Sequence, residues 1–360
     1  MNFTNMELRC LGVLMVTTVL VACGNSETPV QQSAAALPAA AAPAAARASD
    51  QTLAQNTPAI VYDMGGKLDR SFNEAAYRGM ERWKTESGKA YLELEITSEV
   101  QRESALRRMA ERGASPIVGV GVGFGQAGSI AAVAKDYPRL KFVVVDVVVN
   151  APNVQSVVFK EHEGSFLVGA MAAMASKSGK LGFVGGMDIP IIEKFQCGYA
   201  QGAKHVRPQA EVLANMVGTT GAAWNDPARG GALARSQFAM GVDVVFAAAG
   251  GSGIGVYQAA KDAGKLAIGV DSNQNHLQPG VMLTSMLKRV DVAVYNALKG
   301  YKPGTMVLGL KEGGVDVALD EHNAKLFTPA MQSKVEALKT DIIRGKINVV
   351  DYTANNSCVI

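Results

Sequence analysis

The sequence predicts an α/β protein built from two doubly wound lobes with a cleft between them. From Ala59 onward, short apolar runs alternate with amphipathic stretches, which is typical of parallel strands joined by helices. The alternation is interrupted by a long apolar helix at 163–175 and then starts again. Because each series is long enough to form its own sheet, we expect two lobes that face each other across a cleft.

The first series covers residues 59–159 and predicts the first lobe. Its best-defined helix carries Ala76, Met80 and Trp83 on one face and stops at Ser87 and Gly88. Strands are expected at 59–62, 91–96, 116–121, 141–145 and 154–159, with helices at 73–86, 99–112 and 126–135.

The second series predicts the second lobe, and the C-terminal part adds to both. Strands are expected at 180–185, 211–217, 242–247, 266–270 and 281–285, with helices at 163–175, 192–206, 227–240 and 255–263. Residues 290–347 add two helices and a strand at 305–310. We therefore expect a first lobe of 58–162 joined by part of 286–325. The second lobe is expected to be 163–285, joined by part of 326–350, with more than one chain crossing between the lobes.

The first 57 residues do not belong to either lobe. The apolar run at 11–22 is shorter than the roughly 20 residues that span a bilayer, and it ends Leu20-Val21-Ala22-Cys23. This ending resembles a bacterial lipobox, which implies a signal peptide at 1–22 and a lipid on Cys23. An ordinary secretory signal is the alternative. Residues 23–57 are rich in Ala and Pro and predict a flexible tether.

Composition narrows the function further. The formal net charge is only +3, so nothing indicates a nucleic-acid partner. Of the four cysteines, Cys10 would leave with the signal and Cys23 would carry lipid. Cys197 and Cys358 remain, and the sequence leaves open whether they pair. These features place the folded part in the cell envelope, either periplasmic or extracellular.

No catalytic constellation is visible in the sequence. The four histidines lack H-x-x-x-H spacing, and neither G-x-S-x-G nor a Walker A sequence is present. We therefore expect a binding protein, without a metal or a cofactor, rather than an enzyme. One alternative stays open, an exported enzyme that uses the G-x-G-x-x-G loop at Gly123–Gly128 with Asp146 as a ribose-binding acid. The loop follows the third strand of its lobe, however, and not the first.

Two aromatic residues lie where strands of opposite lobes end. Phe72 follows the first strand, in a segment where Ser71 and Glu74 predict a capping box. Trp224 precedes Asp226, which is expected to cap the next helix. Ligands of open α/β sheets bind at the carboxyl ends of the strands. The two rings are therefore candidates for holding a planar group between them.

Polar candidates occupy the same edge of the second lobe. Asp271 ends a strand and can accept two hydroxyl hydrogen bonds. Lys288, just after the strand at 281–285, can donate to the same ligand group or pair with Asp271. Gly251 lies in a glycine-rich loop before a helix, where backbone N–H groups can hold a polar ligand atom.

Six further segments are informative as a set: DRSFN (69–73), EGSFLVG (163–169), GFVGGMDIP (182–190), NDP (225–227), GVDS (269–272) and TSMLKRVD (284–291). In their order and spacing they resemble the basic membrane protein family, lipoproteins that act as purine-nucleoside-receptor-like substrate-binding proteins of ABC importers. The resemblance implies a type I periplasmic-binding-protein fold that closes about a hinge.

The resemblance also implies a site and partners. A purine base would lie between Phe72 and Trp224, and the ribose would bind Asp271 and Lys288. Three further residues of the first lobe would face the ligand: Asp63 and Asn73 at the base or ribose, and Phe124 as a wall. The partners would be an ABC permease and, through Cys23, a membrane, with the protein itself a monomer. Two alternatives stay open: another planar ligand such as a flavin, and a surface lipoprotein with an envelope or host-interaction role.

Overall fold

The computed structural model describes residues 56–358. The predicted signal peptide, Cys23 and nearly all of the tether lie outside the described residues. Within the described part, no helix is both long enough and apolar enough to cross a membrane.

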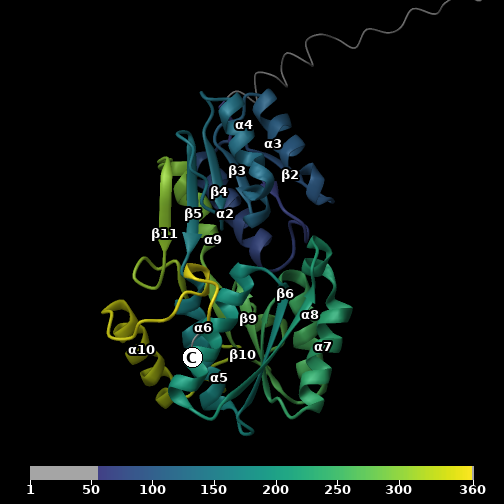
Figure 1. The fold of residues 1–360 in the computed structure, drawn as a ribbon, viewed down its shortest axis with the longest axis vertical. Helices are drawn as coiled ribbons and strands as arrows, with labels where there is room; N and C mark the ends of the chain where they lie inside the picture. Colours follow the sequence, from purple (N-terminus) through teal and green to yellow (C-terminus); the bar gives the residue numbers. More distant parts are fainter. Residues whose placement is uncertain (1–55, 359–360) are drawn as a thin grey trace, which may run out of the picture. The chain divides into compact units, whose positions relative to one another are not determined.

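The described residues form two six-stranded sheets (Figure 1). In the first sheet the order is β11-β5-β4-β3-β1-β2, and all pairs are parallel. In the second the order is β12-β10-β9-β8-β6-β7, and only β12 is antiparallel to its neighbour. The first sheet contains β1 (Ala59–Tyr62), β2 (Leu92–Glu95), β3 (Ile117–Val120), β4 (Phe142–Val145), β5 (Val154–Phe159) and β11 (Gly304–Leu308). The second contains β6 (Lys180–Met187), β7 (Glu211–Gly218), β8 (Val244–Ala248), β9 (Leu266–Asp271), β10 (Met282–Lys288) and β12 (Val315–Val317).

The helices lie close to their predicted positions. They are α2 (Phe72–Ser87), α3 (Arg102–Glu111), α4 (Ser129–Asp136), α5 (Glu161–Ala175), α6 (Pro190–Val206), α7 (Pro227–Ala239), α8 (Gly253–Asp262), α9 (Val290–Lys299) and α10 (Pro329–Ile343). The predicted C-terminus of α2 and the predicted N-terminal cap of α7 are confirmed. Gly88 terminates α2 with a left-handed φ of 68°, and Asp226 caps α7 by accepting from the Arg229 N–H at 2.9 Å. The short strand β12 was not predicted.

Helices cover both faces of each sheet, as the doubly wound prediction requires. Successive side chains of a strand point to opposite faces. In β1, Ile60 and Tyr62 belong to the core that contains Met80 of α2. Val61 belongs to a second core that contains Leu106 of α3. The second sheet repeats this pattern, with α7 and α8 on one face and α5 and α6 on the other.

Within the described residues, the chain passes between the two sheets three times: after β5, after β10 and after β11. After the second crossing α9 packs on α2, and Gly79 permits this because any side chain there would overlap the backbone of Asp291. The C-terminal α10, drawn in yellow-green in Figure 1, packs on α5. The crossings bring segments from distant parts of the chain to the boundary between the lobes.

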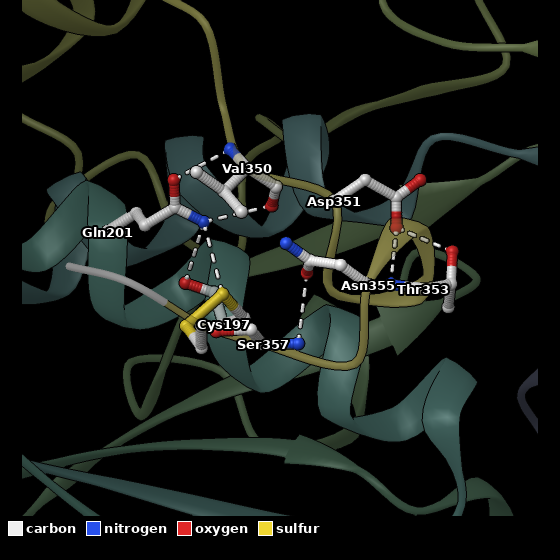
Figure 2. Close-up of a disulfide and its surroundings, with 8 residues drawn as sticks. Cys197, Gln201, Val350, Asp351, Thr353, Asn355 and Ser357 are labelled. Atoms are coloured by element: carbon white, nitrogen blue, oxygen red, sulfur yellow. Dashed lines mark hydrogen bonds between the residues drawn. A yellow bond between two sulfur atoms is a disulfide. The ribbon is translucent and has the colours of Figure 1, made fainter.

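A disulfide fastens the C-terminal segment to the second lobe. Cys197 of α6 is bonded to Cys358, 161 residues later in the sequence (Figure 2). The sequence left this pairing open, and the structure answers it.

Candidate functional site

A cavity lies between the two sheets, where strands of both lobes end. It holds about 660 Å³ of empty space, counting the open solvent at its mouth. The first lobe contributes Asp63, Met64, Asp69, Phe72, Asn73, Gly121, Val122 and Asp146, and the rest of the lining is Ile189, Ile191, Ile192, Phe195, Trp224, Ala248, Gly250, Val270, Asp271 and Lys288. Six of the eight ligand-binding residues predicted from the sequence therefore meet at one cavity.

Both predicted aromatic rings line this cavity. Phe72 is the first residue of α2, and Trp224 lies in a short 3-10 helix, Gly221–Asn225, after β7. The indole of Trp224 lies against Gly186 of β6, where any side chain would overlap the ring. The absence of a side chain at Gly186 therefore leaves space for the Trp224 ring.

The start of α2 is held by Asp69, so the predicted capping box is wrong. The Asp69 carboxylate accepts from the backbone N–H groups of Ser71, Asn73 and Glu74 at 2.8–3.1 Å. The Ser71 side chain makes no capping hydrogen bond. Glu74 accepts from the N–H of Arg70 rather than from that of Ser71. Burial raises the pKa of Asp69 to about 7, although the three N–H groups act to lower it.

Asn73 and Asp63 line the cavity and are held by residues of their own lobe. The Asn73 amide nitrogen donates to the carbonyl groups of Asp63 and Gly66 at 3.2 and 3.1 Å. Its oxygen Oδ1 is buried and has no partner among the described residues. The Asp63 carboxylate binds Arg102, with a shortest distance of 2.9 Å. Burial raises the pKa of Asp63 against the lowering effect of Arg102.

Lys288 is the last residue of β10 and is buried, with a side chain only 2% exposed. Its ammonium lies 2.6 Å from Asp146 and 2.9 Å from Glu161. The alternative that Lys288 pairs with Asp271 is therefore not what the structure shows. Burial disfavours the ammonium, but the nearby carboxylates outweigh it and raise the pKa of Lys288. The same ammonium lies 5.0 Å from the centre of the Phe72 ring, within cation–π range.

Asp271 ends β9 and is bound by the opposite lobe. Its oxygen Oδ2 accepts from the Ser71 hydroxyl at 2.5 Å. Burial raises the pKa of Asp271, whereas Lys288 and the Ser71 hydroxyl lower it. Asp271 and Asp146 both have a positive φ, 63° and 74°, in the left-handed region that Asp tolerates better than most residues. Each of these backbones turns sharply at the end of its strand, beside the cavity.

Two predicted site residues lie elsewhere. Phe124 is fully buried in the core under α3 and α4, so it is not a wall of the cavity. Gly251 is buried next to the backbone of Trp224, and it is the neighbouring Gly250 that lines the cavity. The first part of the loop Gly123–Gly128 packs closely against other side chains of the protein. A side chain at Gly123 would overlap Arg102, and one at Gly125 would overlap Val147.

Several residues of the site were missed from the sequence. The sequence patterns single out neither Asp69 nor Glu161, and they indicate Asp146 only as the ribose-binding acid of a dinucleotide site. Asp146 carried a usable signal, because an Asp that ends a buried strand is expected at the ligand edge of a parallel sheet. Glu161 carried none, because its partner Lys288 is far away in the sequence.

Two doubly wound lobes joined by three crossings, with a cavity where their strands end, form the architecture of two-lobed solute-binding proteins. The family of ABC transporter substrate-binding proteins described as PnrA-like, Bmp, matches residues 57–353, and the chain belongs to this family.

Relatives and solved structures agree with this assignment. The ABC transporter nucleoside-binding protein BmpA of Lactococcus lactis subsp. cremoris is 34% identical over 319 residues, covering 81% of this chain and 88% of that protein. Basic membrane protein D of Borreliella burgdorferi is 33% identical over 308 residues, covering 81% of this chain and 87% of its own length. A solute-binding protein of an ABC transporter system from Aeropyrum pernix K1 has a TM-score of 0.75 and 29% identity, over 82% of this chain and 93% of that one. The family resemblance and the two-lobed fold predicted from the sequence are confirmed.

Proposed function

We propose that this protein binds a purine nucleoside between its two lobes and delivers it to an ABC permease, without catalysing a reaction. The observation that carries the proposal is that Phe72 of one lobe and Trp224 of the other line the same cavity as several hydrogen-bond acceptors. Apolar walls with a few well-placed polar groups are typical of small-molecule sites.

The polar groups suit the hydrogen bonding of a nucleoside. Asn73 Oδ1 and Asp146 Oδ1 are buried acceptors without a hydrogen-bond partner among the described residues. A buried acceptor that stays unsatisfied costs free energy, so a ligand that donates to it is favoured. Ribose hydroxyls and base N–H groups are donors of this kind. Asp271, whose carboxylate can accept several hydrogen bonds, offers further acceptor positions.

Relatives support the same ligand class. The Lactococcus lactis relative is named as a nucleoside-binding protein of an ABC transporter. Its name supports a nucleoside for this chain, and the stacking of a planar base between Phe72 and Trp224 favours a nucleobase over a sugar. A flavin, the planar alternative, would be recognised by the same walls and is therefore included in the test below.

The location proposed for the protein follows from its first residues. The lipobox-like ending at Cys23 supports acylation of that thiol, and residues 23–57 would then tether the lobes to a membrane of the cell envelope. Labelled palmitate should be incorporated into the wild-type protein and not into Cys23→Ser. Equal incorporation in the wild type and in Cys23→Ser would contradict the proposed lipid anchor and would leave the proposed ligand unaffected.

A binding panel tests the ligand. Purified protein is titrated with purine and pyrimidine nucleosides, free bases and a flavin, and binding is followed by thermal shift and by tryptophan fluorescence. The chain has only two tryptophans, so Trp224→Ala should remove most of the fluorescence change. Trp83, which is 8% exposed in the core, should report little. The absence of a shift with every nucleoside would overturn the proposal.

A further inference from the structure

A chain of alternating charges leads from the cavity to the C-terminal segment. Lys288 binds Asp146 at 2.6 Å and Glu161 Oε1 at 2.9 Å. The other oxygen of Glu161, Oε2, lies 3.0 Å from the ammonium of Lys194. Lys194 in turn lies 3.4 Å from Asp351, in the segment after α10. The Glu161 carboxylate thus bridges the lysine of the cavity and a lysine outside it.

One face of α6 carries this connection. Lys194, Cys197 and Gln201 are spaced three and four residues apart, which places them along one stripe of the helix. Gln201 exchanges two hydrogen bonds with the backbone of Val350, at 2.8 and 3.0 Å. Cys197 holds Cys358 covalently (Figure 2). The C-terminal segment 348–358 therefore lies across this stripe and brings Asp351 to Lys194.

Because Glu161 is buried, its charge is sensitive to the two lysines that flank it in this series of ion pairs. The side chain of Glu161 is 1% exposed, so its charge depends on Lys288 and Lys194 for stabilisation. A buried charge that loses a partner is strongly destabilised. Without Lys194, Glu161 would have Lys288 as its one ion-pair partner among the described residues. The ammonium of Lys288 would then be held more strongly toward Glu161 and less toward Asp146 and the cavity.

Lys194 is held in turn by two further groups. Its ammonium also donates to the carbonyl of Phe159 at 2.8 Å, where β5 ends, and the Phe159 ring centre lies 5.2 Å from the Lys288 ammonium. Asp351 is itself fixed, because it accepts from the N–H and the hydroxyl of Thr353 at 2.9 and 2.6 Å. The C-terminal segment thus presents a rigid carboxylate to Lys194.

We propose that Lys194 and Asp351 are positioning residues of the binding site, through which the disulfide-fastened segment 348–358 sets the place of Lys288 in the cavity. This inference rests on the proposed function, since it concerns affinity for the same ligand. It adds that breaking the Cys197–Cys358 bond weakens ligand binding from outside the cavity.

The test compares inosine affinity of the full-length protein with that of variants. Lys194→Met and Asp351→Asn should each bind inosine about fivefold or more weakly, in the range typical of coupled sites. Lys194→Arg, which keeps the charge, should recover much of the loss. Lys204→Met, an exposed lysine of the same helix, is the matched control and should bind as the wild type does. Cys197→Ser with Cys358→Ser should also bind more weakly, and reductant should have no further effect on that variant.

Two results separate positioning from a merely structural role. In a Lys288→Met background the Lys194→Met change should cost little more affinity, because residues acting through one another are not additive. Additive losses, or unchanged affinity in Lys194→Met, would overturn the inference. Without ligand, the side-chain NMR resonance of Lys288 should shift in Lys194→Met and not in Lys204→Met. This second measurement decides the inference even if the wild type binds no nucleoside, an outcome that contradicts the proposed function alone.

Discussion

Ser71 of one lobe donates its hydroxyl hydrogen to Asp271 of the other, although the two residues are 200 positions apart in the sequence. Other hydrogen bonds cross at the same place. Ser272 donates to the carbonyl of Ser71 at 2.8 Å, and Gln274 donates to the carbonyl of Arg70 at 2.9 Å. These contacts require the lobes to be close together, and they converge on the residues that precede Phe72. The start of α2 is therefore both a wall of the cavity and a contact between the lobes.

Ser71→Ala should weaken ligand binding without altering the cavity walls. A hydrogen bond to a charged group contributes about 1.5–3 kcal/mol, and this one forms only when the lobes meet. Its loss favours separated lobes, so nucleoside affinity should fall by about tenfold or more. Calorimetric titration measures the affinity, and small-angle X-ray scattering measures the separation of the lobes without ligand. Ser104→Ala, on the exposed side of α3, is the control. Unchanged affinity in Ser71→Ala would show that closure does not depend on this hydrogen bond.

Two phenylalanines of the first lobe should respond in opposite ways to truncation. Phe72 lines the cavity and is only partly buried, so Phe72→Ala should reduce nucleoside affinity far more than stability. Phe124 is fully buried in the core, and its truncation should lower the free energy of unfolding by about 3–5 kcal/mol. Folded Phe124→Ala protein should keep nearly normal affinity. Urea unfolding and ligand titration of both variants test this contrast. A loss of affinity in Phe124→Ala but not in Phe72→Ala would contradict it.

The sequence was sufficient to predict the two sheets with their covering helices, and the carboxyl ends of the strands as the edge of the candidate site. Apolar runs and strand-end residues are local signals. It could not give the partners of Lys288, since Asp146 and Glu161 come from distant segments that only the crossings bring together. Phe124 was placed wrongly for another reason. A strand-end pattern identifies the edge of a sheet but not the face toward which a loop side chain turns.

The capping error at α2 has a local cause that the sequence did contain. Ser71 and Glu74 have capping-box spacing, but Asp69 precedes Ser71 by two residues and can accept from its N–H as in an Asx turn. Once Asp69 supplies the cap, the Ser71 hydroxyl is free to reach Asp271. A local motif was therefore overridden by a stronger acceptor nearby and by a partner in the other lobe.

Asp69 should make stability depend on pH. Its pKa rises from 3.8 to about 7 on folding, mainly through burial. Between these values the folded protein binds more protons at this group than the unfolded chain does. Its contribution to stability therefore falls as pH rises through this window. Urea unfolding of the wild type and of Asp69→Asn across this range isolates the effect, because other titrating groups are common to both. The stability difference, wild type minus variant, should decrease toward pH 7, and a difference that stays constant would contradict the assignment.

The charge of the cavity should exclude nucleotides. Among its lining residues, Asp63 is neutralised by Arg102, and Asp69, with a pKa of about 7, is partly protonated near neutral pH. Asp146 and Asp271 remain as acidic groups, and the lining ammonium, Lys288, is already bound by Asp146 and Glu161. A phosphate would meet like charges, whose juxtaposition costs several kcal/mol in a desolvated site. Inosine 5′-monophosphate should thus bind on the order of 100-fold more weakly than inosine, measured by competition against the nucleoside. Asp271→Asn removes one negative charge, so it should weaken nucleoside binding more than nucleotide binding. The ratio of inosine affinity to inosine 5′-monophosphate affinity should therefore become smaller. Exposed Asp262→Asn, on α8, should leave the ratio unchanged. Equal affinity for the two ligands would mean that the phosphate lies outside the cavity, and the charge of the lining would then play no part in selection.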